Sequence, residues 1–294
     1  MKKYRNLIIK VLVSSILLAL IYIKVDKQSL INNLSLVDLR YVPFIVLFLA
    51  LNYFFSSVRW KKLLIFENTS HVSVWYLTGL YFIGSFFNNF MPTSIGGDVY
   101  KVYRLGKKIK NTPQALSATF MERFTGVVVL ALISIVGLYK YIGAYTLGLF
   151  VLFVVGFFIG MKLLYVFGKR YKKLQEIYDS LMMYKGKTSV LIFAFVTSLI
   201  VQLMTIFTQY FTFLAIGVHL PFFYSLLVFP VIIIASFFVP SINGIGVQDF
   251  MYIKFFSLAG VTTEVALSAS VLFHLFRLGV SLFGGILYAA NKDA

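Results

Sequence analysis

Apolar runs long enough to cross a lipid bilayer recur along this sequence, and the segments between them are short and rich in lysine and arginine. A run of about 20 apolar residues forms a helix that spans the hydrocarbon core, where every backbone polar group must find its partner within the protein. Hydrophobic residues make up 60% of the 294 residues and charged residues only 13%. This pattern excludes an ordinary soluble domain and predicts an all-α polytopic membrane protein.

We expect one integral membrane domain over residues 1–294, with six full crossings and two re-entrant hairpins, or eight spans if the hairpin arms reach across. The apolar run at about 7–25 follows a basic segment, as in a signal peptide, but it lacks a small-x-small cleavage site. It is therefore interpreted as a retained first helix. The expected parts are two N-terminal helices within 1–62, repeat one at 72–167 with a hairpin at 72–108, a linking helix at 188–216, and repeat two at 221–292 with a hairpin at 222–259.

The basic residues give the chain a formal net charge of +17, and they lie between apolar spans rather than on a soluble domain. That placement follows the positive-inside rule and favours an anionic membrane surface over nucleic acid as the partner. We therefore expect the inner or plasma membrane of a prokaryotic cell, with both termini in the cytoplasm. The sequence Arg59-Trp60-Lys61-Lys62 is interpreted as a cytoplasmic helix end with an interfacial tryptophan.

Two polar stretches interrupt apolar runs at the expected depth of the bilayer. The first is Asn88-Asn89-Phe90-Met91-Pro92-Thr93-Ser94-Ile95-Gly96-Gly97-Asp98, and the second is Val239-Pro240-Ser241-Ile242-Asn243-Gly244-Ile245-Gly246-Val247-Gln248-Asp249. A proline ends a helix because it removes a backbone donor, and glycines let the chain reverse. Irregular backbone at this depth must be buried in protein or line a wet cavity, and an intramembrane acid marks a functional site.

The sequences that follow the two stretches also match. The tetrapeptide Ala-Leu-Ser-Ala begins 17 residues after Asp98 and again 17 residues after Asp249 (115 − 98 and 266 − 249). Arg123 follows the first tetrapeptide and Arg277 the second, at offsets that differ by three residues, close to one helical turn. Three crossings separate the copies, so the second hairpin enters from the side opposite to the first. Inverted repeats with broken helices near the midplane are the architecture of many secondary transporters.

The candidate site combines these breaks with the charged residues of the spans that follow them. Asp98 and Asp249 fall in the first turn of an outgoing helix, where free N–H groups suit an anion such as a phosphodiester, or where the acids serve only as caps. Arg123 and Arg277 are each expected to pair with an aspartate or a lipid phosphate, the alternative being a purely structural ion pair. Lys254 either binds a headgroup or extends to the interface. The candidate residues for the lipid headgroup and transport are Asn88, Asn89, Pro92, Gly96, Gly97, Asp98, Glu122, Arg123, Pro240, Asn243, Gly244, Gly246, Gln248, Asp249, Lys254 and Arg277.

The residue content gives no support for catalysis. The chain has no cysteine, and its three histidines lack the spacing of metal ligands. No nucleophile–base pair or phosphate-binding GxxxxGK[ST] loop is present in the sequence. No catalytic residue, metal or cofactor is therefore expected.

The sequences at 88–98, 122–124 and 240–249 together resemble the lysylphosphatidylglycerol synthase transmembrane family, and the resemblance covers about residues 10–290. It implies a flippase-like membrane domain, which in members with both parts moves aminoacylated phosphatidylglycerol between leaflets. Those members also carry a soluble aminoacyl-tRNA-dependent transferase domain. The sequence to Ala294 contains no such domain, so we expect no lysyltransferase activity.

The resemblance implies a lipid translocase for the headgroup of an anionic or aminoacylated phospholipid, or of a polyprenyl-phosphate-linked lipid. Two alternatives belong to other functional classes. In the first, the chain is a lipid-modifying enzyme such as a phosphatidylglycerol lysyltransferase. In the second, it is a non-transporting partner of a cell-envelope glycosyltransferase. The expected protein partner is a second copy of the chain, in a homodimer, or an envelope-synthesis enzyme.

Overall fold

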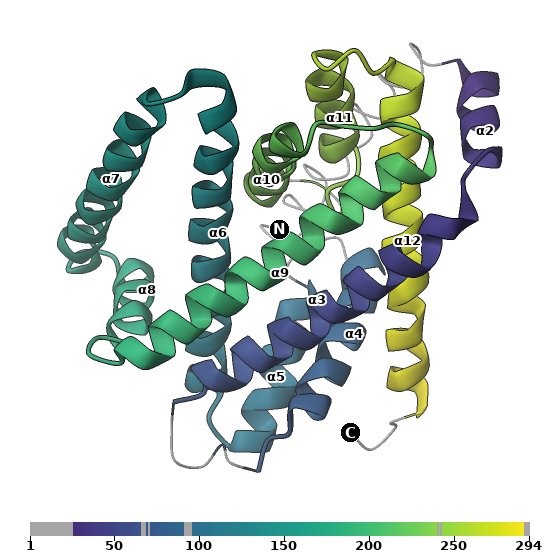
Figure 1. Ribbon diagram of the computed structural model, residues 1–294. Coiled ribbons are helices and arrows are strands. Elements are labelled where there is room, and N and C mark those ends of the chain that lie inside the picture. Colours follow the sequence, from purple (N-terminus) through teal and green to yellow (C-terminus); the bar gives the residue numbers. More distant parts are fainter. Residues whose placement is uncertain are drawn as a thin grey trace.

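The computed structural model describes residues 26–65, 69, 71–90, 96–239, 241 and 243–290. The expected first helix at about 7–25 lies outside this part of the chain, and so do Pro92 and Pro240. The described residues form helices and no β-strand, which confirms an all-α fold (Figure 1). The helices are α2 (Lys27–Ser35), the 3₁₀ helix η1 (Leu39–Tyr41), α3 (Val42–Leu63), α4 (Val74–Phe90), α5 (Gly96–Ile109), α6 (Thr112–Ile142), α7 (Tyr145–Gly168), α8 (Lys172–Met182), α9 (Thr188–Ala215), α10 (Phe222–Phe238), α11 (Val247–Ser257) and α12 (Thr263–Ala290).

Within the described residues, five helical segments are long and apolar enough to cross a membrane. They are Leu39–Leu63, Thr112–Ile142, Tyr145–Gly168, Thr188–Ala215 and Thr263–Ala290. Each corresponds to a span that the sequence predicts. The chain is therefore a polytopic helical membrane protein, as predicted.

The ends of the long helices follow from local sequence. Asn111 precedes α6, and its side-chain oxygen accepts a hydrogen bond from the N–H of Gln114 at 3.1 Å, which satisfies one of the free donors at the helix start. Pro113 in the first turn needs no hydrogen-bonded N–H there. The helix ends at Gly143, whose φ of 53° is accessible to glycine at little cost. These signals fix a span of 31 residues.

Two segments expected as polar connections contain helices. Residues 26–40 include α2, which begins after Asp26, and residues 168–187 include the amphipathic α8. The α8 helix buries Leu181, and its Ser180 hydroxyl lies 3.1 Å from the Ser117 hydroxyl of α6. The basic loop thus packs one apolar side against the membrane domain.

The two predicted hairpins are present as pairs of short helices. The arms α4 and α5 form the first hairpin, and α10 and α11 form the second. Figure 1 shows them at opposite ends of the molecule, α4 and α5 at the bottom and α10 and α11 at the top. The hairpins therefore approach the middle of the molecule from opposite sides.

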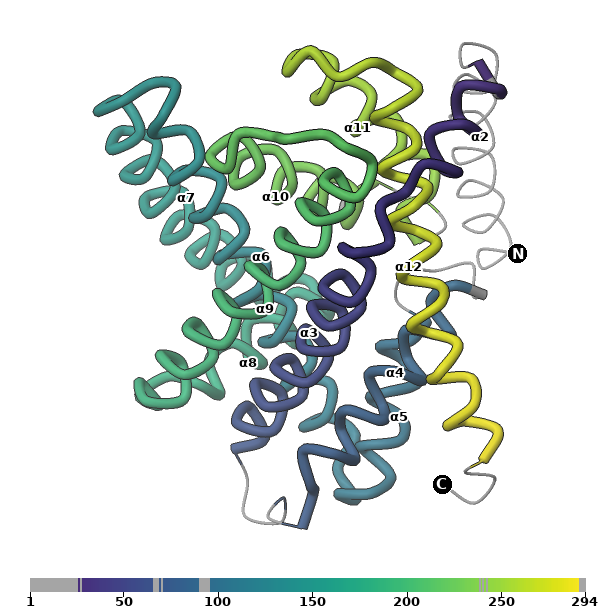
Figure 2. Tube along the Cα trace, turned by 45° about the vertical axis from the view of Figure 1, so that its right-hand side comes forward, coloured from purple at the N-terminus to yellow at the C-terminus, as the bar shows by residue number. Residues whose placement is uncertain are grey.

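The order of a long helix, two short arms and a second long helix occurs twice, as α3 to α6 and as α9 to α12. The helices α3 and α9 pack against each other and run side by side through the middle of the view in Figure 2. The arm α4 packs against α12, and the arm α10 packs against α6. Each incoming arm is thus covered by the long helix that ends the other group, which is the reciprocal packing of an inverted repeat. The helix expected as a linker at 188–216 is α9, and it occupies the place that α3 has in the first group.

Glycines permit both reciprocal contacts. A Cβ atom on Gly284 of α12 would lie 2.0 Å from the carbonyl oxygen of Phe82 on α4. A Cβ atom on Gly137 of α6 would lie 2.5 Å from the backbone nitrogen of Leu227 on α10. Close approach of backbones through small residues is how helices associate in membranes, where the lipid provides no hydrophobic driving force between them.

Candidate functional site

A central cavity of about 300 Å³ lies between the hairpins and the long helices. Its polar and charged lining residues come from both groups of four helices. They are Asn52, Tyr53, Ser56, Arg59, Tyr81, Ser85, Asn88, Asp98, Lys101, Glu122, Arg123, Gln202, Thr205, Thr208, Gln248 and Arg277. Four of these side chains are cationic and two are carboxylates, which leaves a net charge of 4 − 2 = +2 on the cavity wall.

Five charged residues of the first group form a connected charge cluster: Arg59, Asp98, Lys101, Glu122 and Arg123. Arg123 binds Asp98 in a bidentate arrangement, with Nε 2.9 Å from Oδ2 and Nη2 2.8 Å from Oδ1. Lys101 Nζ lies 3.0 Å from Asp98 Oδ1 and 3.9 Å from Glu122 Oε2. The cluster is closed by Arg59, whose Nη2 donates to Glu122 Oε1 at 2.7 Å. Pairing of this kind is what allows charges to remain at bilayer depth.

The sequence builds this cluster by bringing the two arms of the first hairpin close together. The N–H of Gly97 donates to Asn88 Oδ1 at 2.7 Å, and a Cβ atom on Gly97 would lie 2.0 Å from the carbonyl oxygen of Gly84. Only glycine allows that approach, and it places Asp98 and Lys101 on the face of α5 toward α6. The ammonium group of Lys101 also lies 3.7 Å from the ring centroid of Tyr81, a cation–π contact with the other arm.

The expectation of an interfacial Trp60 is wrong, and Arg59 beside it is a buried cavity residue near the end of α3. Its exposed fraction is 4% and that of Trp60 is 0%. The last turn of α3 lies against α4, α6 and α9, so that Arg59 reaches Glu122 and the hydroxyl of Ser198. Trp60 is covered by Tyr81 and Lys101 instead of facing an interface.

Asp249 has a different environment from Asp98. Its Oδ2 accepts from the N–H of Gly246 at 2.8 Å, and its Oδ1 accepts from Ser270 Oγ at 2.6 Å and lies 3.3 Å from His274 Nε2. It is 2% exposed and does not line the central cavity. The geometry is that of a buried helix cap with a histidine partner.

His274, rather than Arg277, is the counterpart of Arg123 in the second group. His274 lies eight residues after Ala266, and Arg123 lies eight residues after Ala115 (274 − 266 and 123 − 115). Each contacts the aspartate of its own hairpin. Arg277 also lines the cavity, but it contacts neither aspartate, because its offset turns its side chain toward a different partner. Its Nη2 donates to Asn243 Oδ1 at 2.8 Å.

The two breaks touch each other through their asparagines. Asn243 of the second break donates to Asn89 of the first, and Asn89 donates in turn to Ser281 of α12 at 2.6 Å. Gly244 and Gly246 have φ angles of 86° and 85°, which glycine adopts readily. The stretches predicted to meet near one centre are therefore joined by a polar contact between the two groups of helices.

Thirteen of the sixteen candidate residues line the central cavity or lie beside it. Those that line the central cavity are Asn88, Gly97, Asp98, Glu122, Arg123, Gln248 and Arg277. Those placed beside it in the two hairpins are Asn89, Gly96, Asn243, Gly244, Gly246 and Asp249, while Pro92 and Pro240 lie outside the described residues. Lys254 belongs to neither set: its exposed side chain lies over the ring of Phe250 and away from the cavity.

Sequence reasoning missed a polar stripe on α3 and another on α9. Asn52, Ser56 and Arg59 recur at helical spacing on α3 and face the cavity, as do Gln202, Thr205 and Thr208 on α9. Asn52 Nδ2 donates to Thr205 Oγ1 at 2.8 Å and joins the two stripes. The 3.6-residue period of polar residues within apolar spans is the signal that would have found them.

Two arginines keep free N–H groups in this cavity. Arg123 uses Nε and Nη2 for Asp98, and Arg277 uses Nη2 for Asn243, so no acceptor among the described residues occupies the Nη1 group of either. The side chain of Arg123 is 43% exposed. Free donors of the planar guanidinium group in a polar, positively charged cavity suit the oxygens of a phosphate or carboxylate.

The fold and this cavity define an integral membrane protein built around two opposed hairpins. The chain belongs to the family described as the lysylphosphatidylglycerol synthase TM region, which matches residues 7–285. No curated protein and no solved structure matches the chain. The family membership indicates a function connected with membrane lipids.

Proposed function

We propose that this chain is a lipid translocase that moves the headgroup of an anionic or aminoacylated phospholipid, or of a polyprenyl-phosphate-linked lipid, between the leaflets. The observation that carries the proposal is the central cavity, whose charged residues sum to +2 and include two arginines with free N–H groups. A phosphodiester in the cavity would accept hydrogen bonds from Arg123 and Arg277. Its acyl chains would stay in the surrounding lipid.

The arrangement of the hairpins supports alternating access. The cavity lies where arms from opposite ends of the molecule meet, and such a site is exposed to each side in turn when one group of helices rocks against the other. The contact between Asn89 and Asn243 joins the two groups at the breaks, so rocking would break it.

Proton coupling is our proposal for the energy source, with Asp98, Glu122 and Asp249 as the candidate groups. The first two belong to the charge cluster, where three cations face two carboxylates and any change in one pair alters its neighbours. An anionic headgroup that binds Arg123 would compete with Asp98 for the same guanidinium. Binding of the lipid headgroup would therefore be coupled directly to the interactions of the Asp98 carboxylate.

The test is leaflet exchange in reconstituted vesicles. The full chain is placed in liposomes with a trace of fluorescent phosphatidylglycerol, and a membrane-impermeant reductant reports the fraction of label in the outer leaflet over time. We expect exchange with the wild type, at least tenfold slower exchange with Arg277→Ala since one charge-assisted phosphate contact contributes roughly 1.5–3 kcal/mol, and wild-type exchange with the matched control Arg170→Ala. Arg170 is exposed in the loop before α8. Equal exchange in wild type, Arg277→Ala and empty vesicles would refute the proposal.

A non-catalytic role is part of the same proposal. The matched region is the transmembrane part of the family, and the polar groups around the cavity are engaged mostly with one another. Purified chain supplied with lysyl-tRNA and phosphatidylglycerol is expected to form no lysylphosphatidylglycerol, as followed by thin-layer chromatography of labelled lysine. Product formation above the tRNA-only background would favour the enzyme alternative.

A further inference from the structure

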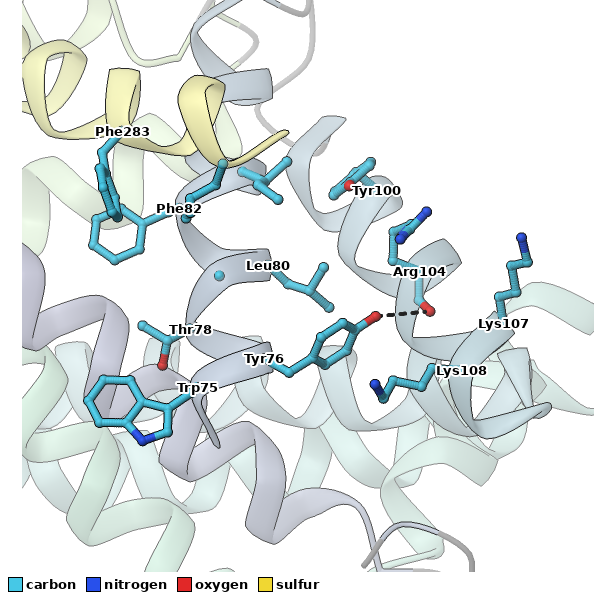
Figure 3. Close-up of a pocket in the computed structure, with 13 residues that line it drawn as sticks. Trp75, Tyr76, Thr78, Leu80, Phe82, Tyr100, Arg104, Lys107, Lys108 and Phe283 are labelled. Atoms are coloured by element: carbon cyan, nitrogen blue, oxygen red, sulfur yellow. Dashed lines mark hydrogen bonds between the residues drawn. The ribbon is translucent and has the colours of Figure 1, made fainter. Parts of the chain in front are cut away.

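A second cavity, separate from the central one, lies on the outer side of the first hairpin. This lateral groove of about 850 Å³ runs between α4, α5 and α12 and shares no lining residue with the central cavity. Figure 3 shows its two ends: the basic side chains of α5 on one side, and the rings of Phe82 and Phe283 on the other. Its volume falls within the range of roughly 300–1,000 Å³ that small-molecule sites occupy.

The arm α4 separates the two cavities and presents a different surface to each. Its Tyr81, Ser85 and Asn88 recur at intervals of three and four residues and line the central cavity. Its opposite face, which includes Gly79 and Phe82, lines the lateral groove with apolar and aromatic atoms. The lateral groove therefore suits an apolar part of a ligand, whereas the central cavity suits a polar one.

The basic end of the groove carries three cations on one face of α5. Arg104, Lys107 and Lys108 stand at positions i, i+3 and i+4, and no carboxylate among the described residues lies within 4.0 Å of their nitrogens. Lys108 Nζ lies 4.0 Å from the ring centroid of Tyr76, and the Tyr76 hydroxyl donates to the carbonyl oxygen of Arg104 at 3.5 Å (Figure 3). These contacts hold the arms together at the mouth and leave the three cations facing outward.

We propose that the lateral groove binds one anionic phospholipid of the surrounding bilayer, with its phosphate at Arg104, Lys107 and Lys108 and an acyl chain along Phe82 and Phe283. Phe283 of α12 is 51% exposed and Trp75 at the start of α4 is 75% exposed, so the apolar wall faces outward. Charge complementarity selects an anion, and the apolar wall beside it selects one that carries a hydrocarbon chain. Basic pockets between transmembrane helices bind anionic headgroups by this combination. This site is distinct from the transport path and stands whether or not the chain moves lipid.

Trp75 provides a local probe of the groove. The chain has two tryptophans, and Trp60 is fully buried, so only Trp75 can meet a lipid chain. The full chain is reconstituted with brominated phosphatidylglycerol or brominated phosphatidylcholine at equal mole fraction, and quenching of fluorescence gives their relative affinity at Trp75. We expect preferential quenching by the anionic lipid in the wild type.

Two variants test the two halves of the proposal. Arg104→Gln with Lys107→Gln and Lys108→Gln should lower the relative affinity for phosphatidylglycerol about fivefold for each charge removed. Gly79→Leu should reduce quenching by both lipids, because a Cβ atom there meets no atom within 4 Å and the side chain fills the groove without displacing protein.

Matched controls keep the experiment decisive. Arg170→Gln with Lys172→Gln and Lys173→Gln removes three exposed charges elsewhere, and Gly156→Leu adds the same side chain to α7, where a Cβ atom also meets nothing. Both controls should retain the wild-type preference. Equal quenching by the two lipids in the wild type, an equal loss in the control triple variant, or no effect of Gly79→Leu would overturn the proposal. Absence of quenching by either lipid would also overturn it, because a protein surface would then cover the groove.

Discussion

At the scale of single residues, the two halves stabilise the aspartates of their hairpins in different ways. Asp98 receives two cations, Arg123 and Lys101, whereas Asp249 receives a backbone N–H, a serine hydroxyl and a histidine. A carboxylate paired with fixed cations leaves those cations unpaired when it is removed. A carboxylate that acts mainly as a helix cap can be replaced by another cap at smaller cost.

We therefore expect Asp98→Asn to lower thermal stability more than Asp249→Asn. The first change leaves Arg123 and Lys101 without their common partner. The second retains a side-chain oxygen for the N–H of Gly246, and its NH2 group can donate to the Ser270 hydroxyl. Fluorescence-detected unfolding of the two variants in one detergent gives the comparison. The reverse order would mean that the two acids do not differ in the way their contacts indicate.

Glu122 is the partner of two cations of the charge cluster and gives a second prediction. Replacing Glu122 by Gln leaves Arg59, which is 4% exposed, without its carboxylate. Breaking a buried pair from one side costs about 3–5 kcal/mol. Equilibrium unfolding in mixed detergent should register a loss of that order, while the exposed Glu176→Gln on α8 should change stability by less than about 0.5 kcal/mol.

The sequence revealed which residue types stand at the site but not all of their partners. An aspartate was one of the partners expected for Arg123, and the structure pairs it with Asp98. Arg59 was assigned to a helix end because it lies beside two lysines, and His274 was passed over because the histidines were considered only as metal ligands, for which their spacing is unsuited. Both depend on which helices lie side by side, and no local pattern in one sequence encodes that.

At the scale of helices, apolar length and the breaks predicted the five long spans and both hairpins. The helix α8 was missed because a basic loop hides an 11-residue amphipathic segment, whose apolar side gains its partner only from α6. The crossings of α4 with α12 and of α10 with α6 also could not be predicted from the sequence. Glycines mark such crossings only after the partner helix is known, since α7 carries glycines with nothing packed on them.

This difference among glycines gives a prediction for helix packing. Gly284→Ala and Gly137→Ala each place a Cβ atom within 2.5 Å of a backbone atom of the facing arm, so we expect a loss of about 1–3 kcal/mol from overpacking. Gly156→Ala on α7 meets no atom within 4 Å, and its helix propensity should add roughly 0.5–1 kcal/mol. Thermal unfolding of the three variants measures the expected loss of stability in the first two and the expected gain in the third. Destabilisation by Gly156→Ala would contradict the packing argument.

At the scale of the whole molecule, the matched tetrapeptides predicted two related halves, and the structure adds the way in which they interlock. Ala115 and Ala118 are fully buried in the first half, and Ala266 and Ala269 in the second, where they admit the returning arm of their own hairpin. Each incoming arm packs on the other half. The proposed rocking of one half would therefore slide α4 along α12 and α10 along α6, with the contact between the two asparagines at the centre.

That motion can be stopped by a covalent link. The chain has no cysteine, so Asn89→Cys with Asn243→Cys creates a unique pair where the two side chains now form a hydrogen bond. A short bifunctional methanethiosulfonate should join the pair and reduce lipid exchange to the level of empty vesicles, and a reductant should restore it. Ser117→Cys with Ser180→Cys is the matched control, because those hydroxyls lie 3.1 Å apart between α6 and α8, away from the contacts between the two halves, and linking them leaves the halves free to move. Wild-type exchange in the linked Asn89 and Asn243 variant would show that lipid crosses without separation of the two breaks, and alternating access would then be abandoned.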